Sequence, residues 1–134
     1  MVMTPAQLAK SGTEDAHQVA LFCHVQSLLV RWPVLRWLHA IPNGGDRNPA
    51  VAGRLKVGGV KRGVPDIFLP VAKRGYHGLY IELKKPGREK DARGGLSVEQ
   101  DEFKRDIEAQ GYAVIVCYGW EQAAKVIEGY MSHD

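Results

Sequence analysis

The segment that most constrains this chain is residues 79–84, with the sequence LYIELK, in which apolar and polar side chains alternate. Successive side chains of a β-strand point to opposite faces, so the apolar residues share one face and Glu82 and Lys84 are predicted to share the other. Asp66 opens a second strand-like segment, residues 66–69 (DIFL). Two neighbouring strands would therefore bring two carboxylates and one ammonium together.

Such a group of side chains suits the hydrolysis of a phosphodiester, which needs an activated water and stabilisation of negative charge. Mg²⁺ can supply both, and it prefers oxygen ligands from one or two carboxylates. We expect Asp66 and Glu82 to bind the metal, with the backbone carbonyl of Leu83 as a further ligand. Lys84 would position the water or neutralise the phosphate. The alternative is a set of ordinary strand carboxylates paired with lysines, but the spacing, the shared face and the basic flanks favour a site.

Glu14 is the candidate third acid and third metal ligand. It heads a stripe at helical spacing that continues through Gln18 and the apolar residues of 21–28, so its side chain is predicted to face inward. The alternative is a helix cap, because Ser11 and Glu14 have the spacing of a capping box. Asp15, on the adjacent stripe, is the fallback acid.

Gln100 lies on the apolar side of an otherwise acidic predicted helix, three and seven residues before Phe103 and Ile107. A polar group in such a position needs hydrogen-bond partners. Two interpretations stay open: Gln100 hydrogen-bonds within the core, or it reaches the site of Asp66 and Glu82.

The composition predicts a single domain over residues 1–134, in which residues 1–12 form a polar lead. Hydrophobic residues make up 45% of the chain, yet no apolar stretch reaches the length of about 18 residues that spans a membrane. The start lacks the layout of a signal peptide. Cys23 and Cys117 lie in apolar segments without metal-type spacing, which indicates reduced thiols and a cytoplasmic protein. The chain contains no P-loop, CxxC pair or GxSxG motif.

Basic residues gather on both sides of the carboxylate motif. Residues 43–63 contain five basic residues and one acidic residue, and residues 84–93 contain five and two. Solvated surface is the ordinary explanation of such segments, but positive charge beside a hydrolytic site favours a polyanion partner. The basic residues expected to contact phosphate are Lys61, Arg62, Lys85, Arg88 and Lys90.

Hydrophobic periodicity and breaker residues predict an α/β fold with a mixed central sheet flanked by helices. The predicted elements are a helix over 13–32, a strand over 34–41, a turn over 42–45, a short helix over 48–56, strands over 66–71 and 78–84, a loop over 86–95, a helix over 97–110, a strand over 112–118 and a helix over 120–131. Ser97 is a favourable N-cap, and Gly111 a favourable helix stop.

Residues 63–66 (GVPD) and 82–84 (ELK) resemble the motifs of the PD-(D/E)XK nuclease superfamily, and the finer resemblance is to its VRR-NUC family. Further motifs of that family match Glu14 with Gln18, Asn43-Gly44 with Arg47, residues 59–66 (GVKRGVPD) and residues 96–100 (LSVEQ). The resemblance covers about residues 14–130, nearly the whole chain.

The resemblance implies a restriction-endonuclease-like core and DNA cleavage that depends on Mg²⁺, with Mn²⁺ as a substitute. It places Glu14, Asp66, Glu82 and Lys84 at the site and Gln100 nearby, and Asn43 and Arg47 are expected to contact DNA. Stand-alone members are similar to Holliday-junction resolvases, so branched DNA such as a four-way junction is the expected substrate and a homodimer the expected assembly. The alternatives are a flap or restriction-type nuclease and a non-catalytic DNA-binding module.

Overall fold

The centre of the computed structural model, which describes residues 2–42 and 49–133, is a four-stranded sheet in the order β1-β2-β3-β4. The strands are β1 (His39–Ala40), β2 (Ile67–Leu69), β3 (Leu79–Lys84) and β4 (Ala113–Tyr118). β1 pairs with β2 and β2 with β3 in the antiparallel sense, whereas β3 and β4 are parallel. The sheet is therefore mixed, which confirms the predicted α/β class.

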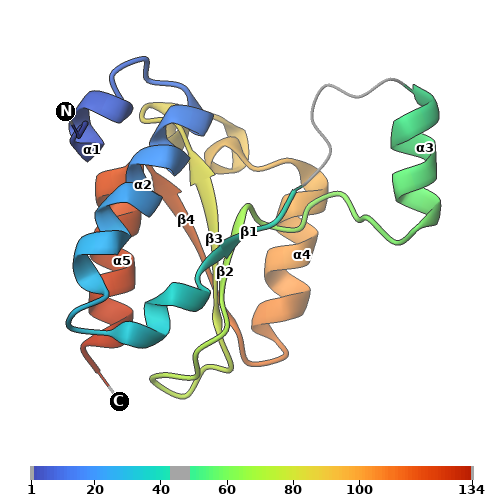
Figure 1. Ribbon diagram of the computed structural model, residues 1–134. Coiled ribbons are helices and arrows are strands. Elements are labelled where there is room, and N and C mark those ends of the chain that lie inside the picture. Colours follow the sequence, from blue (N-terminus) through green and yellow to red (C-terminus); the bar gives the residue numbers. More distant parts are fainter. Residues whose placement is uncertain (1, 43–48, 134) are drawn as a thin grey trace.

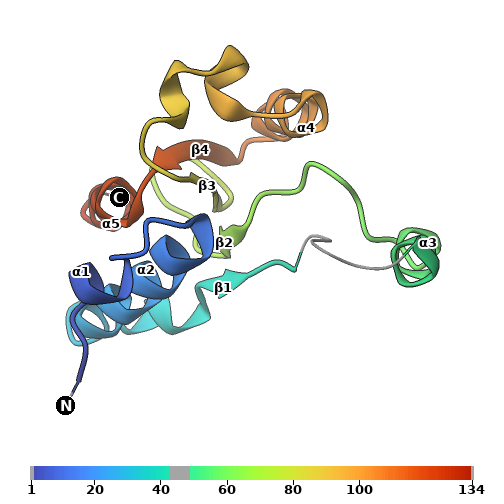
Figure 2. The same cartoon turned by 90° about the horizontal axis from the view of Figure 1, so that it is seen from above.

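Helices cover both faces of this sheet (Figures 1 and 2). α2 (Glu14–Leu28) and α5 (Trp120–Met131) lie on one face, and α4 (Val98–Glu108) lies on the other. The short α1 (Pro5–Leu8) packs beside α2. α3 (Pro49–Val57) has no buried residue and stands away from the rest of the molecule (Figure 1).

The hydrophobic core lies between the sheet and the layer formed by α2 and α5. The alternation of residues 79–84 predicts one apolar face of β3, and this face is buried in the core: its three apolar residues are at most 2% exposed. They pack with Ile67 and Leu69 of β2, Leu21 and Val25 of α2, and Ile127 of α5. Burial of apolar surface at about 25 cal/mol per Å² makes this layer the main source of stability and fixes the register of β3.

The opposite face of β3 is buried under α4 rather than open to solvent. Tyr80 stacks on Phe68 of β2 and meets Phe103 of α4 edge to face. Farther along the same face, Glu82 and Lys84 are 3% and 7% exposed. Both faces of β3 are therefore covered, and its charged residues lie in a sheltered environment.

The predicted strand over 34–41 is mostly wrong. Residues Pro33–Trp37 form a 3₁₀ helix, η1, and only His39–Ala40 pair as a strand. The buried side chains of this segment are Leu35 and Leu38, three residues apart, a spacing that suits a 3₁₀ turn and not the two-residue period of a strand. Pro33 begins the turn, where its fixed φ is favourable.

Several other predicted helices, strands and loops differ from the structure in where they end or in what they contain. The helix predicted over 13–32 ends at Leu28, and β2 ends at Leu69, directly before Pro70, which cannot donate a ladder hydrogen bond. The polar lead contains α1, and the loop over 86–95 contains two 3₁₀ turns, η2 (Arg88–Lys90) and η3 (Ala92–Gly95). Ser97 caps α4 as predicted, and Gly111 follows it with φ 94°.

Two expectations from composition can be compared with the structure. In the part of the chain that is described, no helix combines the length and the apolar character needed to cross a membrane. Cys23 and Cys117 are both free thiols, in agreement with the prediction.

Candidate active site

Antiparallel pairing of β2 and β3 brings Asp66 and Glu82 together. Ile67 pairs with Ile81, so Asp66, one residue before β2, lies beside Glu82. The Asp66 Oδ2 atom accepts a hydrogen bond of 2.8 Å from the backbone N–H of Leu83. The strand register therefore sets the separation of the two acids, and a backbone donor orients one of them.

Glu82 is the most deeply buried acid of the site. Its Oε1 atom accepts a hydrogen bond from Gln100 Nε2 at 2.9 Å, but Oε2 has no hydrogen-bond partner among the described residues. Burial, followed by the proximity of Asp66, raises the pKa of Glu82 to about 8. Burial also raises the pKa of Asp66, against the opposing effect of the Leu83 N–H. Without a cation, the pair resists full ionisation.

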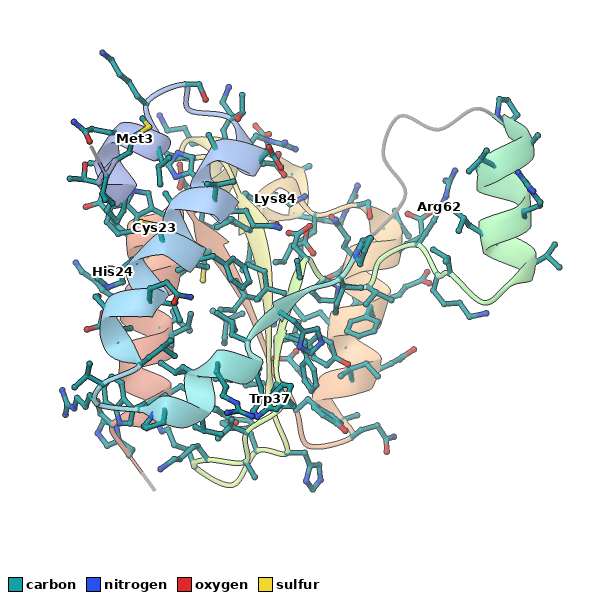
Figure 3. All side chains as sticks on the ribbon, viewed as in Figure 1. Met3, Cys23, His24, Trp37, Arg62 and Lys84 are labelled. Atoms are coloured by element: carbon teal, nitrogen blue, oxygen red, sulfur yellow. The ribbon has the colours of Figure 1, made fainter. Side chains whose placement is uncertain are left out.

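Lys84 contributes a sheltered positive charge at the end of β3. Its Nζ atom donates to Gln100 Oε1 at 3.2 Å and lies 3.6 Å from Glu82 Oε1. The side chain is 8% exposed, so this charge acts in a medium of lower effective dielectric than bulk water. Lys84 therefore lies where the sequence predicts it, on the same face of the strand as Glu82; Figure 3 labels its side chain.

Gln100 connects the start of α4 to this site. Its Oε1 atom accepts from the backbone N–H of Ser97, while the Ser97 hydroxyl accepts from the backbone N–H of Gln100, which completes a capping box. The same side chain reaches Glu82 and Lys84. Of the two open interpretations, the structure supports contact with the site, together with a helix-capping role for Gln100 that was not predicted.

Gly63 allows the segment before Asp66 to pass against the first turn of α4. Its φ is +89°, and a Cβ at this position would lie 2.6 Å from the carbonyl carbon of Glu99 and 3.0 Å from the Gln100 nitrogen. Only glycine combines this conformation with such a close approach. The contact places Asp66 and Gln100 on adjoining walls of one cavity.

This carboxylate cavity, as we call it, has a volume of about 300 Å³. It is lined by the proposed site residues and their neighbours: Glu14, Arg62, Gly63, Val64, Asp66, Glu82, Lys84, Ser97, Glu99 and Gln100. All five predicted catalytic residues therefore border one space, although they come from α2, β3, α4 and the segment before β2.

Glu14 borders the cavity but does not face inward as predicted. Its side chain is 44% exposed and lies 3.7 Å from the guanidinium of Arg88. The capping box of Ser11 and Glu14 is absent, because Thr13 is the N-cap and its hydroxyl accepts from the N–H of Ala16. Glu14 is the first residue of α2, so its side chain points past the end of the helix. Helical spacing in the sequence does not reveal this. Asp15 is also exposed.

The two central acids fit a divalent cation. The hydrogen bond between the Glu82 and Asp66 carboxyls lets the buried pair share a proton, and a bound cation would take the place of that proton and favour both ionised acids. Mg²⁺ commonly takes one or two carboxylates from a protein and completes its shell with water and substrate oxygens. Within residues 2–42 and 49–133, no group of three or more His, Cys, Asp or Glu side chains is arranged to hold a metal. The carboxylates that these positions bring together for a metal are therefore Asp66 and Glu82, and Glu14 does not join them as a third close acid.

The predicted DNA contacts fall into three groups. Lys61, Arg62, Lys85 and Lys90 are exposed, with Arg62 at the edge of the carboxylate cavity and on the segment that joins α3 to β2 (Figure 3). Arg88 is already paired with Glu14, Asp91 and the Gly95 carbonyl. Asn43 and Arg47 lie outside the described residues.

Arg88 has a structural role that was not predicted. Its guanidinium ties α2 to the two 3₁₀ turns that follow β3. The three-residue spacing of Arg88 and Asp91 is a local signal for part of this contact. The contact to Glu14 joins residues far apart in the chain and has no sequence signal.

A mixed sheet that presents two acids and a lysine under a capping helix defines a nuclease-type α/β domain of the PD-(D/E)XK class. The VRR-NUC domain family matches residues 12–121, and the chain belongs to this family. A solved structure described as a VRR_NUC domain protein is similar to it, with a TM-score of 0.62 and 28% identity over 90% of this chain and 88% of that chain. No curated protein matches the chain. The family and the structural relative together indicate a nuclease.

Proposed function

We propose that this protein is a DNA endonuclease that depends on a divalent metal, with Mg²⁺ as the cofactor and Mn²⁺ as a substitute. The observation that carries the proposal is the buried pair of Glu82 and Asp66 carboxyls, in which Glu82 Oε2 receives no hydrogen bond from an N–H or O–H donor of the described chain. Lys84, close to the same carboxylate, separates this arrangement from a simple metal-binding site. In this arrangement the metal would activate the water, and the lysine would offset the negative charge that develops on the phosphate.

Each side chain then has a defined task. Asp66 and Glu82 would hold the metal, with the Leu83 carbonyl and Glu14 as further candidate oxygen ligands. When bound, the metal lowers the pKa of a water molecule and offsets charge on the phosphate. Lys84 donates to the attacking water or to a phosphate oxygen and stabilises the charge that develops there. Gln100 holds Glu82 and Lys84 in a fixed relation through its two amide atoms.

The test is cleavage of labelled DNA with and without Mg²⁺, in the wild type and in Asp66→Asn. Asp66→Asn should abolish cleavage and leave the fold intact. Metal-free DNA binding should hold or rise, because a negative charge near phosphate is removed. Asp106→Asn, at an exposed acid of α4, is the matched control and should cleave like the wild type. Cleavage by Asp66→Asn at the wild-type rate, or wild-type cleavage in excess chelator, would contradict the proposal.

We further propose branched DNA, such as a four-way junction, as the substrate. α3 and the segment that joins it to β2 project from the body and carry Arg54, Lys56, Lys61 and Arg62 at exposed positions or at the border of the cavity (Figures 1 and 2). A basic arm that starts at the border of the catalytic cavity and projects from the body suits a second duplex arm of the same substrate. Because a junction is resolved by cuts in two strands, the active form is expected to be a homodimer.

Side-by-side cleavage of a four-way junction, a 5′ flap, a 3′ flap and a plain duplex checks this substrate choice. Preference for the junction, with paired cuts and a mass in solution of two chains, is the expected result. Equal or faster cleavage of a flap or a linear duplex would favour the flap or restriction-type alternative. Binding of all four without cleavage at any metal concentration would favour a non-catalytic DNA-binding module.

A further inference from the structure

A second cavity, of about 460 Å³, adjoins the carboxylate cavity. The two share Lys84, Ser97 and Gln100 as lining residues, so one wall separates them. We call this second space the arginine cavity, because Arg88 and Arg93 both line it. Lys84 therefore borders both cavities.

The two arginines of this cavity differ in what they contact. The three donor groups of Arg88 meet Asp91, the Gly95 carbonyl and Glu14, so Arg88 serves as part of the wall. Arg93 uses only Nε, which donates to the Leu96 carbonyl at 3.1 Å. Within the described chain, no hydrogen bond or ion pair engages its two terminal nitrogens. Asp91, the acid of this cavity, is already paired with Arg88.

The backbone presents Arg93 in an unusual conformation. Arg93, Gly94 and Gly95 have φ values of 54°, 61° and 84°, three successive residues in the left-handed region. Tyr118 secures this turn by donating its hydroxyl to the Gly94 carbonyl at 2.7 Å. A non-glycine residue in the left-handed region is uncommon and costs conformational energy. Glycine would avoid that cost at position 93, as it would at Arg74, which has a similar φ of 55°.

We propose that the arginine cavity binds a backbone phosphate of the cleaved DNA strand, next to the scissile phosphate, and that Arg93 is its contact. This inference rests on the proposed nuclease function. A guanidinium with two free terminal nitrogens presents the parallel donors that a phosphate accepts. Lys84 lies between the two cavities, so successive phosphates of one strand would lie on either side of its ammonium. The ligand class is a nucleic-acid phosphodiester, and Arg93 discriminates charge rather than base sequence.

The chain offers a matched control for this arginine. Arg74, in the turn between β2 and β3, has φ 55° and is exposed, but it lines neither cavity. Glycine suits both backbone positions, so Arg93→Gly and Arg74→Gly should both fold and should gain similar stability. Only Arg93→Gly should weaken DNA binding, by about 5- to 20-fold in chelator. The slope of log affinity against log salt should also fall by about 0.7–0.9, the loss of one phosphate contact.

Single methylphosphonate linkages, placed one at a time along the strand, locate the contact. A methylphosphonate at one position should weaken DNA binding by the wild type and by Arg74→Gly but not by Arg93→Gly. That position should be next to the bond that is cut in the presence of Mg²⁺. Equal binding by the two glycine variants, or additive losses at every linkage, would overturn the inference. DNA that is bound with this pattern but not cut would instead count against the nuclease proposal and leave the phosphate contact standing.

Discussion

Gln100 donates a hydrogen bond of 2.9 Å to Glu82, and its other amide atom accepts from the first residue of its own helix cap, Ser97. One side chain therefore joins the start of α4 to the central strand of the sheet. The amide that donates to Glu82 Oε1 also accepts one of the hydrogen bonds that cap α4. Helix capping and the geometry of the candidate site are coupled at this residue.

Substitutions at Gln100 and Ser97 should separate the two roles. Ser97→Ala removes one cap hydrogen bond and should cost about 1 kcal/mol of stability, with cleavage close to wild type. Gln100→Ala leaves Glu82 Oε1 without its donor in a buried place, so it should cost more stability. It should also reduce cleavage by about 10- to 100-fold, as is typical when the partner of a metal ligand is lost. Urea unfolding and single-turnover kinetics check both values, and equal cleavage by the two variants would contradict the role assigned to Gln100.

Lys84 should matter for turnover and not for metal binding. Lys84→Ala is expected to bind Mg²⁺ nearly as the wild type does and to cleave about 10²–10³-fold more slowly, since one positioned electrostatic partner is lost. Lys84→Arg should restore cleavage only in part. The Lys84 side chain is 8% exposed, and the planar guanidinium of arginine does not have the shape of an ammonium in such a confined place. Single-turnover cleavage of a four-way junction with a parallel metal titration tests this. Joint loss of metal binding and cleavage, or loss of neither, would refute it.

The raised pKa of Glu82 predicts how metal-free stability depends on pH. Its pKa is about 8 in the folded protein against an ordinary value of 4.5. Between these values the folded protein holds a proton that the unfolded chain has released, so stability should fall as pH rises from 4.5 to 8. A tenfold difference in proton affinity between the folded and unfolded states corresponds to about 1.4 kcal/mol of stability. Saturating Mg²⁺ should offset the loss at high pH, because it favours the ionised acids.

Chemical unfolding in chelator at several pH values, repeated with Mg²⁺, measures this effect. Glu82→Gln is the matched variant, because the amide resembles the protonated acid and does not titrate. It should flatten the pH dependence of stability and remove most of the stabilisation by Mg²⁺. The same pH slope in the wild type and Glu82→Gln would show that the titration belongs to another group.

Gly63 should be less tolerant of a side chain than its neighbour in sequence, Gly59. Both have positive φ, 89° and 103°, so alanine brings a similar backbone cost at each. A Cβ at Gly59 meets nothing within 4 Å, whereas at Gly63 it meets the backbone of Glu99 and Gln100. Gly63→Ala should therefore lower the unfolding temperature more and reduce cleavage, because the segment carrying Asp66 must move. Equal effects of the two alanines would show that the close approach has no consequence.

The central part of the site was predictable because it depends on short-range patterns. Alternation in residues 79–84 placed Glu82 and Lys84 on one face, and the strand-like segment after Asp66 predicted a neighbouring strand. The N-cap at Ser97 follows from the chemistry of its hydroxyl group. In contrast, the strand predicted near Leu35 is wrong because tertiary burial there follows a spacing of three residues.

The residues alone determined the acids, the lysine, the mixed α/β class and the basic flanks, since each depends on residue type and local periodicity. The tertiary structure decided which oxygen of Glu82 lacks a partner, that Glu14 pairs with Arg88 outside the buried acids, and that Arg93 lines a second cavity. These features depend on contacts between segments far apart in the chain. Distance and burial exist only after folding, so no spacing in the sequence could indicate them.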